Sequence, residues 1–282
     1  MGQIYMGRAN PFGVLVAGLT AGELVLFREA VDEKRRRCYG RKPPPHWHRP
    51  RALTKAAPVR ASFIRPMCHN TPVECAAELC GFSHKTAFEW RRGVLFTLTG
   101  YQDRFVLCDT VWVDKIHIID TVLSRGYRQA CKHGLSRQRL CICVAIDIHK
   151  NPVTVVCGHG KPSSARVRKA MGGRIALGPL PIHDLEQAHG ALVREGGLES
   201  EAHRADVNDP VYLERMEMVN DLCSWLKRYL WRFTGMLPRN LQAYLDWYAY
   251  LFQTNQSRYR WDPTARVVRH ILMADATYRS LG

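Results

Sequence analysis

Apolar residues dominate three neighbouring segments in the middle of the chain, and their pattern is typical of β-strands. Residues 104–120, RFVLCDTVWVDKIHIID, are rich in valine and isoleucine, with polar Lys115 and His117 among them. Segments 138–147 and 152–160 have the same character, with turn-forming residues between them. The pattern predicts a three-stranded meander.

Helical periodicity replaces this pattern further along the chain. Residues 163–171 predict a helix, and 175–184, IALGPLPIHD, a fourth strand that ends at Asp184. Residues 185–197, 209–233 and 239–252 predict three more helices, the last so aromatic that it must pack against a large surface. The long helix has a buried stripe at three-and-four spacing, made of Tyr212, Met216, Val219, Cys223, Leu226 and Leu230. Strands followed by helices and another strand imply an α/β sheet.

Two short helices are predicted before the meander. In TPVE, Thr71 is the expected N-cap, Pro72 the first helical residue and Glu74 the partner in a capping box; Gly81 ends this helix. Ser83 caps a second helix, HKTAFEWRRGVLF. Such a tight connection predicts a helix-turn-helix, which we favour over a helical hairpin buried in a core. Its second helix would offer these residues to DNA: His84, Lys85, Thr86, Arg91 and Arg92.

Four regions follow from these patterns. Residues 1–69, which contain RKPPPHWHRPR, are expected to be an irregular basic region, and 70–100 the helix-turn-helix. The α/β domain spans 104–255, and 256–282 form a basic C-terminal tail.

Charge and cysteine usage narrow the class of protein. The 282 residues carry 41 Lys and Arg against 25 Asp and Glu, a formal net charge of +16, which favours nucleic acid over a membrane surface as the partner. The apolar stretch at 11–27 includes Glu23 and is too short to span a membrane. Ten scattered cysteines without a signal peptide indicate the cytoplasm. We expect Cys141 and Cys143 to point to opposite faces of a strand, and no zinc site is predicted.

Candidate chemistry comes from Asp114 in the first strand, Asp184 at the end of the fourth and Asn220 on the long helix. Two-metal phosphodiester chemistry needs oxygen ligands that converge on two cations about 4 Å apart, and strand ends facing a helix can supply them. Taken singly, each residue is more typical of a turn or a surface. The order of Asp114, Asp184 and Asn220 along the chain, with the elements that carry them, favours the two-metal interpretation.

Residues 71–253 resemble the DDE transposases of insertion sequences, in the group that joins a helix-turn-helix to a ribonuclease H-like domain. The resemblance is carried by ECAAELCGFSHKTAFEWRR, VWVDKIHI, GLSRQRLCICVAID, PVTVVCGHGKPS, PIHDLEQAH and the helical segment from 218 to 252. Spacings of 70 residues from Asp114 to Asp184 and 36 from Asp184 to Asn220 are comparable with the family's layout.

The resemblance implies a ribonuclease H-like mixed sheet flanked by helices. Asp114 and Asp184 would be metal ligands for two Mg²⁺ or Mn²⁺ ions, and Asn220 would stand where most members have a third acid. Lys227, seven residues after Asn220, would lie on the same face of the helix and would be a further catalytic residue. The implied activity is cleavage and strand transfer of double-stranded DNA, at the ends of a mobile element and at its target. The implied protein is a homo-oligomer on the prokaryotic nucleoid.

The sequence departs from the family at several points, so two alternatives stay open. Asn220 replaces an acid, Lys115 stands where relatives commonly have one, and the cysteine pairs of a zinc ribbon are missing. A decayed, DNA-binding relic and a nuclease without strand transfer are the competing interpretations. We expect Lys115 to point to the opposite face from Asp114, so that it need not touch the metals.

Other residues near these positions receive structural interpretations. His183 and His189 are expected to be a turn residue and a helix-surface residue rather than catalytic groups. Trp225, Trp231 and Trp247 are expected to be core residues rather than platforms for unpaired bases.

Overall fold

The chain divides into two compact units, Met1–Thr97 with Ser257–Gly282, and Leu98–Gln256. The computed structural model describes residues 63–120, 138–176, 178, 180–184, 200–204, 206, 208–233 and 236–256, with five helical positions between 263 and 270. The predicted helix at 185–197, with His189, lies outside these residues. The division at Thr97–Leu98 precedes the predicted start of the α/β domain, and the predicted tail is grouped with the first unit.

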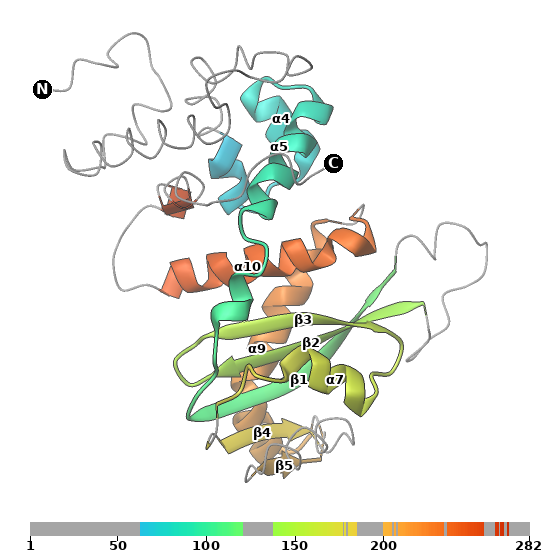
Figure 1. Cartoon of the computed structure of the whole chain (residues 1–282), viewed down its shortest axis with the longest axis vertical. Coiled ribbons are helices and arrows are strands. Elements are labelled where there is room, and N and C mark those ends of the chain that lie inside the picture. Colours follow the sequence, from blue (N-terminus) through green and yellow to red (C-terminus); the bar gives the residue numbers. More distant parts are fainter. Residues whose placement is uncertain are drawn as a thin grey trace, which may run out of the picture. The chain divides into compact units, whose positions relative to one another are not determined.

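The first unit contains two helices joined by three residues, α4 (Val73–Cys80) and α5 (His84–Phe96) (Figure 1). Gly81 ends α4 with a left-handed φ of 68°, which glycine adopts without a steric penalty. The Ser83 side chain accepts a hydrogen bond from the Thr86 backbone N–H and caps α5, as predicted. The predicted capping box at Thr71 is wrong, because Pro72 is the N-cap of α4 and no side chain caps it.

A further helical segment precedes α4. Residues 63–68 are helical, although the sequence pattern predicts an irregular region there. Phe63 is buried, and its ring centroid lies 6.2 Å from that of Phe82 and 6.0 Å from that of Trp90. The segment is too short to show a period by itself, and its helix is stabilised by burying this aromatic cluster.

The second unit is built on a mixed five-stranded sheet, which confirms the predicted α/β class. Its strands are β1 (Thr110–Ile119), β2 (Arg139–Asp147), β3 (Pro152–His159), β4 (Leu180–Asp184) and β5 (Glu201–His203). Their order is β3-β2-β1-β4-β5 (Figure 1). The first three strands are antiparallel, as in the predicted meander, whereas β4 runs parallel to β1 and β5 parallel to β4. The three-residue β5 was not predicted because it is too short to show a pattern.

Helices cover both faces of the sheet. On one face, α7 (Ser164–Met171) packs Val167, Ala170 and Met171 against a core that includes Val111 and Val113 of β1. On the other face lies α9 (Pro210–Trp231), where the Trp112 indole donates a 2.7 Å hydrogen bond to the Arg215 carbonyl. Consecutive β1 residues therefore alternate between the α7 face and the α9 face, as the pleat requires.

Three cysteines lie on the α7 face of the sheet. Cys141 and Cys143 both belong to the buried core on that side, so the expectation that they point to opposite faces is wrong. Residues two apart in a strand project to the same side. The Sγ of Cys143 lies 2.7 Å from the Sγ of Cys157 on β3.

The last helix of the second unit, α10 (Leu241–Gln256), packs its aromatic side chains against α9 and the short 3₁₀ helix η1 (Tyr101–Arg104). Tyr229 of α9 lies 5.1 Å from Tyr248, and Tyr101 of η1 lies 5.2 Å from Tyr250, measured between ring centroids. The large surface that the aromatic pattern requires is thus supplied by β3 together with α9 and η1.

On α9, five of the six predicted stripe residues are buried: Met216, Val219, Cys223, Leu226 and Leu230. Tyr212, the sixth, is only partly buried. Within the described part of the chain, no helix combines the length and the apolar character needed to cross a membrane.

Candidate active site

Asp114 and Asp184 lie side by side on adjacent strands. The parallel register pairs Val111 with Pro181 and Val113 with His183, so the next positions, Asp114 and Asp184, are neighbours where β4 ends. Asp114 is two residues beyond Trp112 in β1, so its side chain projects to the same face of the sheet, toward α9. Both predicted acids therefore project from the sheet toward α9, although they are 70 residues apart in sequence.

Cys223 of α9 contacts the first of these acids. Its Sγ lies 3.5 Å from Asp114 Oδ2, within the range of a thiol hydrogen bond. Burial raises the pKa of the Cys223 thiol, and the negative charge of Asp114 raises it further. The thiol therefore stays protonated at neutral pH and donates its hydrogen to the carboxylate.

Lys115 contacts the second acid, although it was expected to point to the opposite face from Asp114. Its Nζ lies 3.4 Å from Asp184 Oδ2, and the two side chains are 9% and 18% exposed. Strand alternation fixes only the direction in which Cβ leaves the backbone, and the long, flexible lysine side chain is free to bend toward a carboxylate at the end of the neighbouring strand. A protein cation thus lies against one of the two proposed metal ligands.

Tyr212 adds a hydroxyl near both acids. Burial raises the pKa of its phenol, and the negative charges of Asp114 and Asp184 raise it further, while Lys115 lowers it in part. Tyr212 therefore keeps its proton at neutral pH. The spacing of apolar residues counts Tyr212 as part of the buried stripe and does not predict this position. The hydroxyl at the N-terminal end of that stripe was the available signal.

Asn220 and Lys227 lie on the same helix, on either side of Cys223. Asn220 is half-buried and precedes Cys223 by three residues, so it is on a neighbouring part of the helix surface. Lys227 is exposed one turn beyond Cys223, and its charge partly offsets the rise in the thiol pKa. The structure thus brings Asp114 and Asp184 together directly, whereas Asn220 and Lys227 are placed near them by helical spacing.

Among the described residues, no trio of histidine, cysteine or acidic ligand atoms that includes Asp114 or Asp184 lies close enough together to enclose an ion. Asn220, the third predicted ligand, would contribute an amide oxygen. An amide oxygen is a weaker ligand for a hard cation than a carboxylate, but it has the same donor chemistry.

His183 is not the surface turn residue that the sequence suggested. It lies within β4 with 4% of its surface exposed, and its Nδ1 is 2.5 Å from the Asp184 carbonyl oxygen. Its imidazole therefore helps to fix the end of the strand that carries Asp184.

The five residues proposed to bind DNA fall into two groups on α5. His84, Lys85 and Arg92 are exposed, and Thr86 is half-buried, with its hydroxyl 2.8 Å from that of the cap Ser83. Arg91 is only 3% exposed, and its guanidinium donates to the Thr71 carbonyl oxygen next to the start of α4. The assignment of Arg91 to DNA contact is therefore wrong, because its side chain is used to tie the two helices together.

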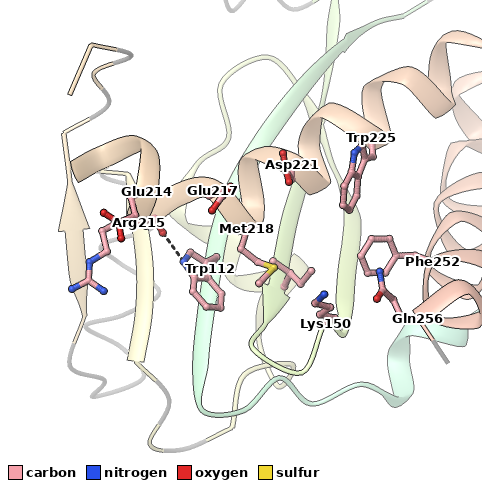
Figure 2. Close-up of a pocket in the computed structure, with 11 residues that line it drawn as sticks. Trp112, Lys150, Glu214, Arg215, Glu217, Met218, Asp221, Trp225, Phe252 and Gln256 are labelled. Carbon is pink, nitrogen blue, oxygen red and sulfur yellow. Dashed lines mark hydrogen bonds between the residues drawn. The ribbon is translucent and has the colours of Figure 1, made fainter. Parts of the chain in front are cut away.

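A pocket of about 320 Å³ lies between the sheet, α9 and α10 (Figure 2). Trp112 and Lys150 line it together with Glu217, Asp221 and Trp225 of α9. The carboxylates make it a poor site for phosphate, and the pocket contains neither Asp114 nor Asp184. Figure 2 shows Glu217 and Asp221 of α9 among the residues that line this pocket.

The three tryptophans expected in the core differ in exposure. Trp247 is buried at 2%, as expected, but Trp225 is 41% exposed and Trp231 is 80% exposed, so for these two the core interpretation is wrong. Both lie outside the stripe of α9 that faces the sheet, so burial of that stripe does not cover them.

The sequence matches no protein-family model and no curated protein. The assignment of this site therefore depends on its geometry.

Proposed function

We propose that this protein is a DNA transposase that cleaves and joins DNA strands with a ribonuclease H-like domain. One observation carries the proposal: Asp114 and Asp184 lie at neighbouring positions on parallel strands and face the helix that holds Asn220. This is the arrangement in which carboxylates on a rigid sheet converge on a cation.

The topology of the second unit supports the finer fold assignment. Three antiparallel strands are followed by a helix and by two strands parallel to the first, in the order β3-β2-β1-β4-β5, with α7 and α9 on opposite faces. This agrees with the ribonuclease H-like arrangement implied by the resemblance. Fold alone does not give a function, so the proposal depends on the acids.

The donor set suits a hard divalent cation. Carboxylate and amide oxygens are the ligands that Mg²⁺ and Mn²⁺ prefer. Asp114, Asp184 and Asn220 would hold the cations, which would activate the attacking oxygen and stabilise the leaving one. The chain's own contribution is to fix Asp114 through Cys223 and to hold the end of β4 through His183.

The DNA would be recognised in part by the first unit. His84, Lys85 and Arg92 are exposed on the first three turns of α5, where a recognition helix would carry its base and phosphate contacts. The net charge of +16 supports a polyanionic partner. In this proposal the protein binds the double-stranded ends of a mobile element as a homo-oligomer.

A second candidate is favoured by a specific contact. The Lys115 ammonium lies against Asp184 and can supply the positive charge that a metal would otherwise provide. A relic that binds DNA without cleaving it would have this feature. The nuclease alternative differs from the transposase only in the absence of joined products.

The test is Mg²⁺- or Mn²⁺-dependent cleavage and joining of a labelled duplex that carries the DNA flanking the gene. Asp114→Ala and Asp184→Ala should each lower cleavage by at least a hundredfold while DNA affinity changes little, because the acids contribute to the reaction rather than to phosphate binding. Asp221→Ala is the matched control, since this acid lies on α9 and lines the pocket, which contains neither Asp114 nor Asp184.

Each outcome decides between the candidates. Joined products that disappear in both active-site variants and persist in Asp221→Ala would support the transposase, and cleaved products without joining would support the nuclease. Cleavage that survives Asp114→Ala would contradict the site assignment. Binding without any cleavage in the unmodified protein would support the relic.

A further inference from the structure

A second group of metal-ligand side chains lies where β1 begins. Cys108 and Asp109 immediately precede the strand, and His149 lies in the turn between β2 and β3. One ligand atom from each residue lies within 4.8 Å of those from the other two. Asp109 precedes Asp114 by five residues, or roughly 16 Å of extended strand, so this group is separate from the proposed catalytic acids.

Backbone hydrogen bonds fix the segments of this group. The Ile148 N–H, next to His149, donates to the Thr110 carbonyl at 3.0 Å and joins the two segments, and the Leu180 N–H of β4 donates to the Asp109 carbonyl at 2.8 Å. Asp109 itself has a φ of 59°, in the left-handed region that non-glycine residues rarely adopt. The carboxylate of Asp109 is thus held next to His149 at some conformational cost.

The turn that carries His149 is fixed by a buried acid. Asp147 is fully buried, and its carboxylate accepts hydrogen bonds from the Asn151 backbone N–H at 2.8 Å and side-chain amide at 2.9 Å. His149 therefore projects from a rigid turn, and its Nε2 lies 2.6 Å from Asp109 Oδ2. Preorganised ligands of this kind lose little conformational freedom when a metal binds.

We propose that Cys108, Asp109 and His149 form a binding site for Zn²⁺ or a similar borderline divalent cation. Thiolate, carboxylate and imidazole are the three ligand types that Zn²⁺ takes from proteins. Around a tetrahedral zinc ion the ligand atoms are about 3.3–3.8 Å apart, so the group needs only small side-chain rotations to reach that spacing. Three protein ligands leave one position open for water or an exogenous ligand.

Exposure and charge both suit an entering cation. Asp109 and His149 are exposed and Cys108 is half-buried, so an ion reaches the ligands from solvent. Asp109 and Asp147 place negative charge beside the Cys108 thiol, and the Cys108 and His149 side chains would release their protons when a cation binds.

Co²⁺ is the probe for this site, because thiolate coordination gives it a charge-transfer absorption band and Zn²⁺ displaces it. Titration of the full chain should give the thiolate band in the unmodified protein and in Cys75→Ser, whose exposed thiol on α4 is the matched control. Cys108→Ser should abolish the band, and His149→Ala should weaken Co²⁺ binding by roughly tenfold or more. A band that is absent from the unmodified protein, or that survives Cys108→Ser, would overturn the proposal.

Thiol alkylation provides a second measurement that does not depend on a cysteine variant. Zn²⁺ should slow the iodoacetamide labelling of Cys108, measured by peptide mass spectrometry, in the unmodified protein but not in His149→Ala. Labelling of Cys75 should not change in either protein. Equal labelling rates for Cys108 with and without Zn²⁺ would also overturn the proposal. Neither readout needs DNA cleavage, so the zinc site and the transposase activity can fail independently.

Discussion

At the scale of single residues, the central question is which cation balances the two acids of the candidate site. Two carboxylates on adjacent strands repel each other unless positive charge lies nearby. In this structure Lys115 supplies that charge at Asp184, while Asp114 accepts a hydrogen bond from the neutral thiol of Cys223. Lys115 and a divalent cation would therefore compete for Asp184.

Removing the Lys115 charge should strengthen metal binding at this site. Lys115→Gln eliminates the competing ammonium, and we expect Mn²⁺ affinity to rise by roughly fivefold, equivalent to about 1 kcal/mol for a partly screened ion pair. Calorimetric Mn²⁺ titration measures this change. Lys169→Gln, on the exposed face of α7, is the control for net charge. Equal Mn²⁺ affinity in the two variants would show that Lys115 does not compete with metal.

Substitutions of the two adjacent arginines on α5 should affect different properties of the protein. Arg92→Ala should weaken DNA binding and reduce the dependence of log affinity on log salt by about 1, because one phosphate contact is lost. Arg91→Ala should instead destabilise the first unit by about 2–4 kcal/mol, since it removes a buried charged hydrogen bond and leaves the Thr71 carbonyl unpaired. Salt-dependent DNA binding and thermal unfolding measure the two effects; the reverse result would restore Arg91 as a DNA contact.

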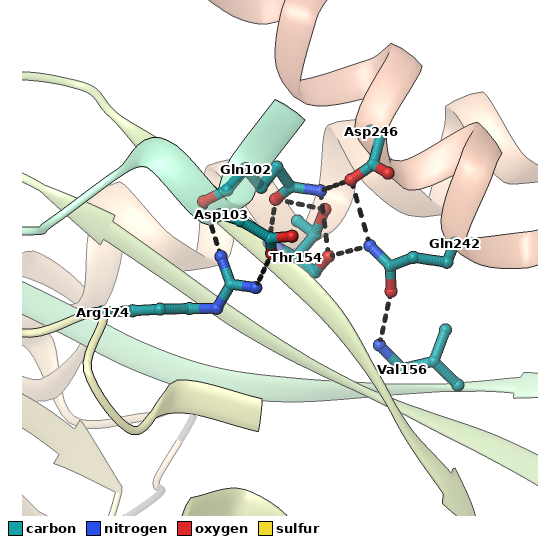
Figure 3. A network of polar contacts seen from close by, with 7 residues as sticks. All are labelled: Gln102, Asp103, Thr154, Val156, Arg174, Gln242 and Asp246. Carbon is teal, nitrogen blue, oxygen red and sulfur yellow. Dashed lines mark hydrogen bonds and ion pairs between the residues drawn. The ribbon is translucent and has the colours of Figure 1, made fainter. Parts of the chain in front are cut away.

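At the scale of secondary-structure elements, the outer edge of β3 is closed by side-chain amides (Figure 3). Gln102 accepts from the Thr154 N–H at 2.6 Å and donates to its carbonyl at 3.1 Å, while Gln242 of α10 accepts from the Val156 N–H at 3.1 Å. Both amides also donate to the buried Asp246, at 2.8 Å and 3.2 Å. These contacts cover an edge that would otherwise be open to another strand.

The buried acid of this network gives a pH-dependent prediction. Burial raises the pKa of Asp246 above 3.8, although Gln102 and Gln242 lower it in part. The folded state therefore holds this proton more tightly than the unfolded state, so the contribution to stability is present below pH 3.8 and is lost as pH rises through the folded pKa. Asp246→Asn does not titrate, and its stability relative to the unmodified protein should increase as pH rises across this range.

Urea unfolding of both proteins at several pH values measures this difference. Asp246→Ala is the contrasting variant, because it removes the acceptor and leaves two buried amides without it, at a cost of about 1–3 kcal/mol. A constant stability difference between Asp246→Asn and the unmodified protein would show that Asp246 does not titrate differently in the folded state.

At the scale of the whole molecule, charge controls the proposed association with DNA. A chain with a net charge of +16 releases counterions from each phosphate that it neutralises. We expect DNA affinity of the full chain to fall by roughly a thousandfold between about 50 mM and 200 mM salt, which corresponds to at least six phosphate contacts. Fluorescence anisotropy with labelled duplex measures this slope, and binding that does not depend on salt would contradict a phosphate-based interface.

The sequence by itself determined most of the elements, because periodicity and capping are local properties, but it missed the helix at 63–68 and the three-residue β5. It located Ser83 as the cap of α5, Gly81 as the end of α4, the meander of β1 to β3, and Asp184 at the end of β4. It also gave the buried stripe of α9, since apolar spacing along a helix directly specifies the face that packs.

Only the tertiary structure decided what those residues contact. Parallel pairing of β4 with β1 brings Asp184 beside Asp114, and strand pairing across a long connection leaves no local signal. The Lys115 contact, the burial of Arg91 and the convergence of Cys108 with His149 depend on side chains from distant segments. Such contacts are set by packing between elements, which a one-dimensional pattern of residues does not encode.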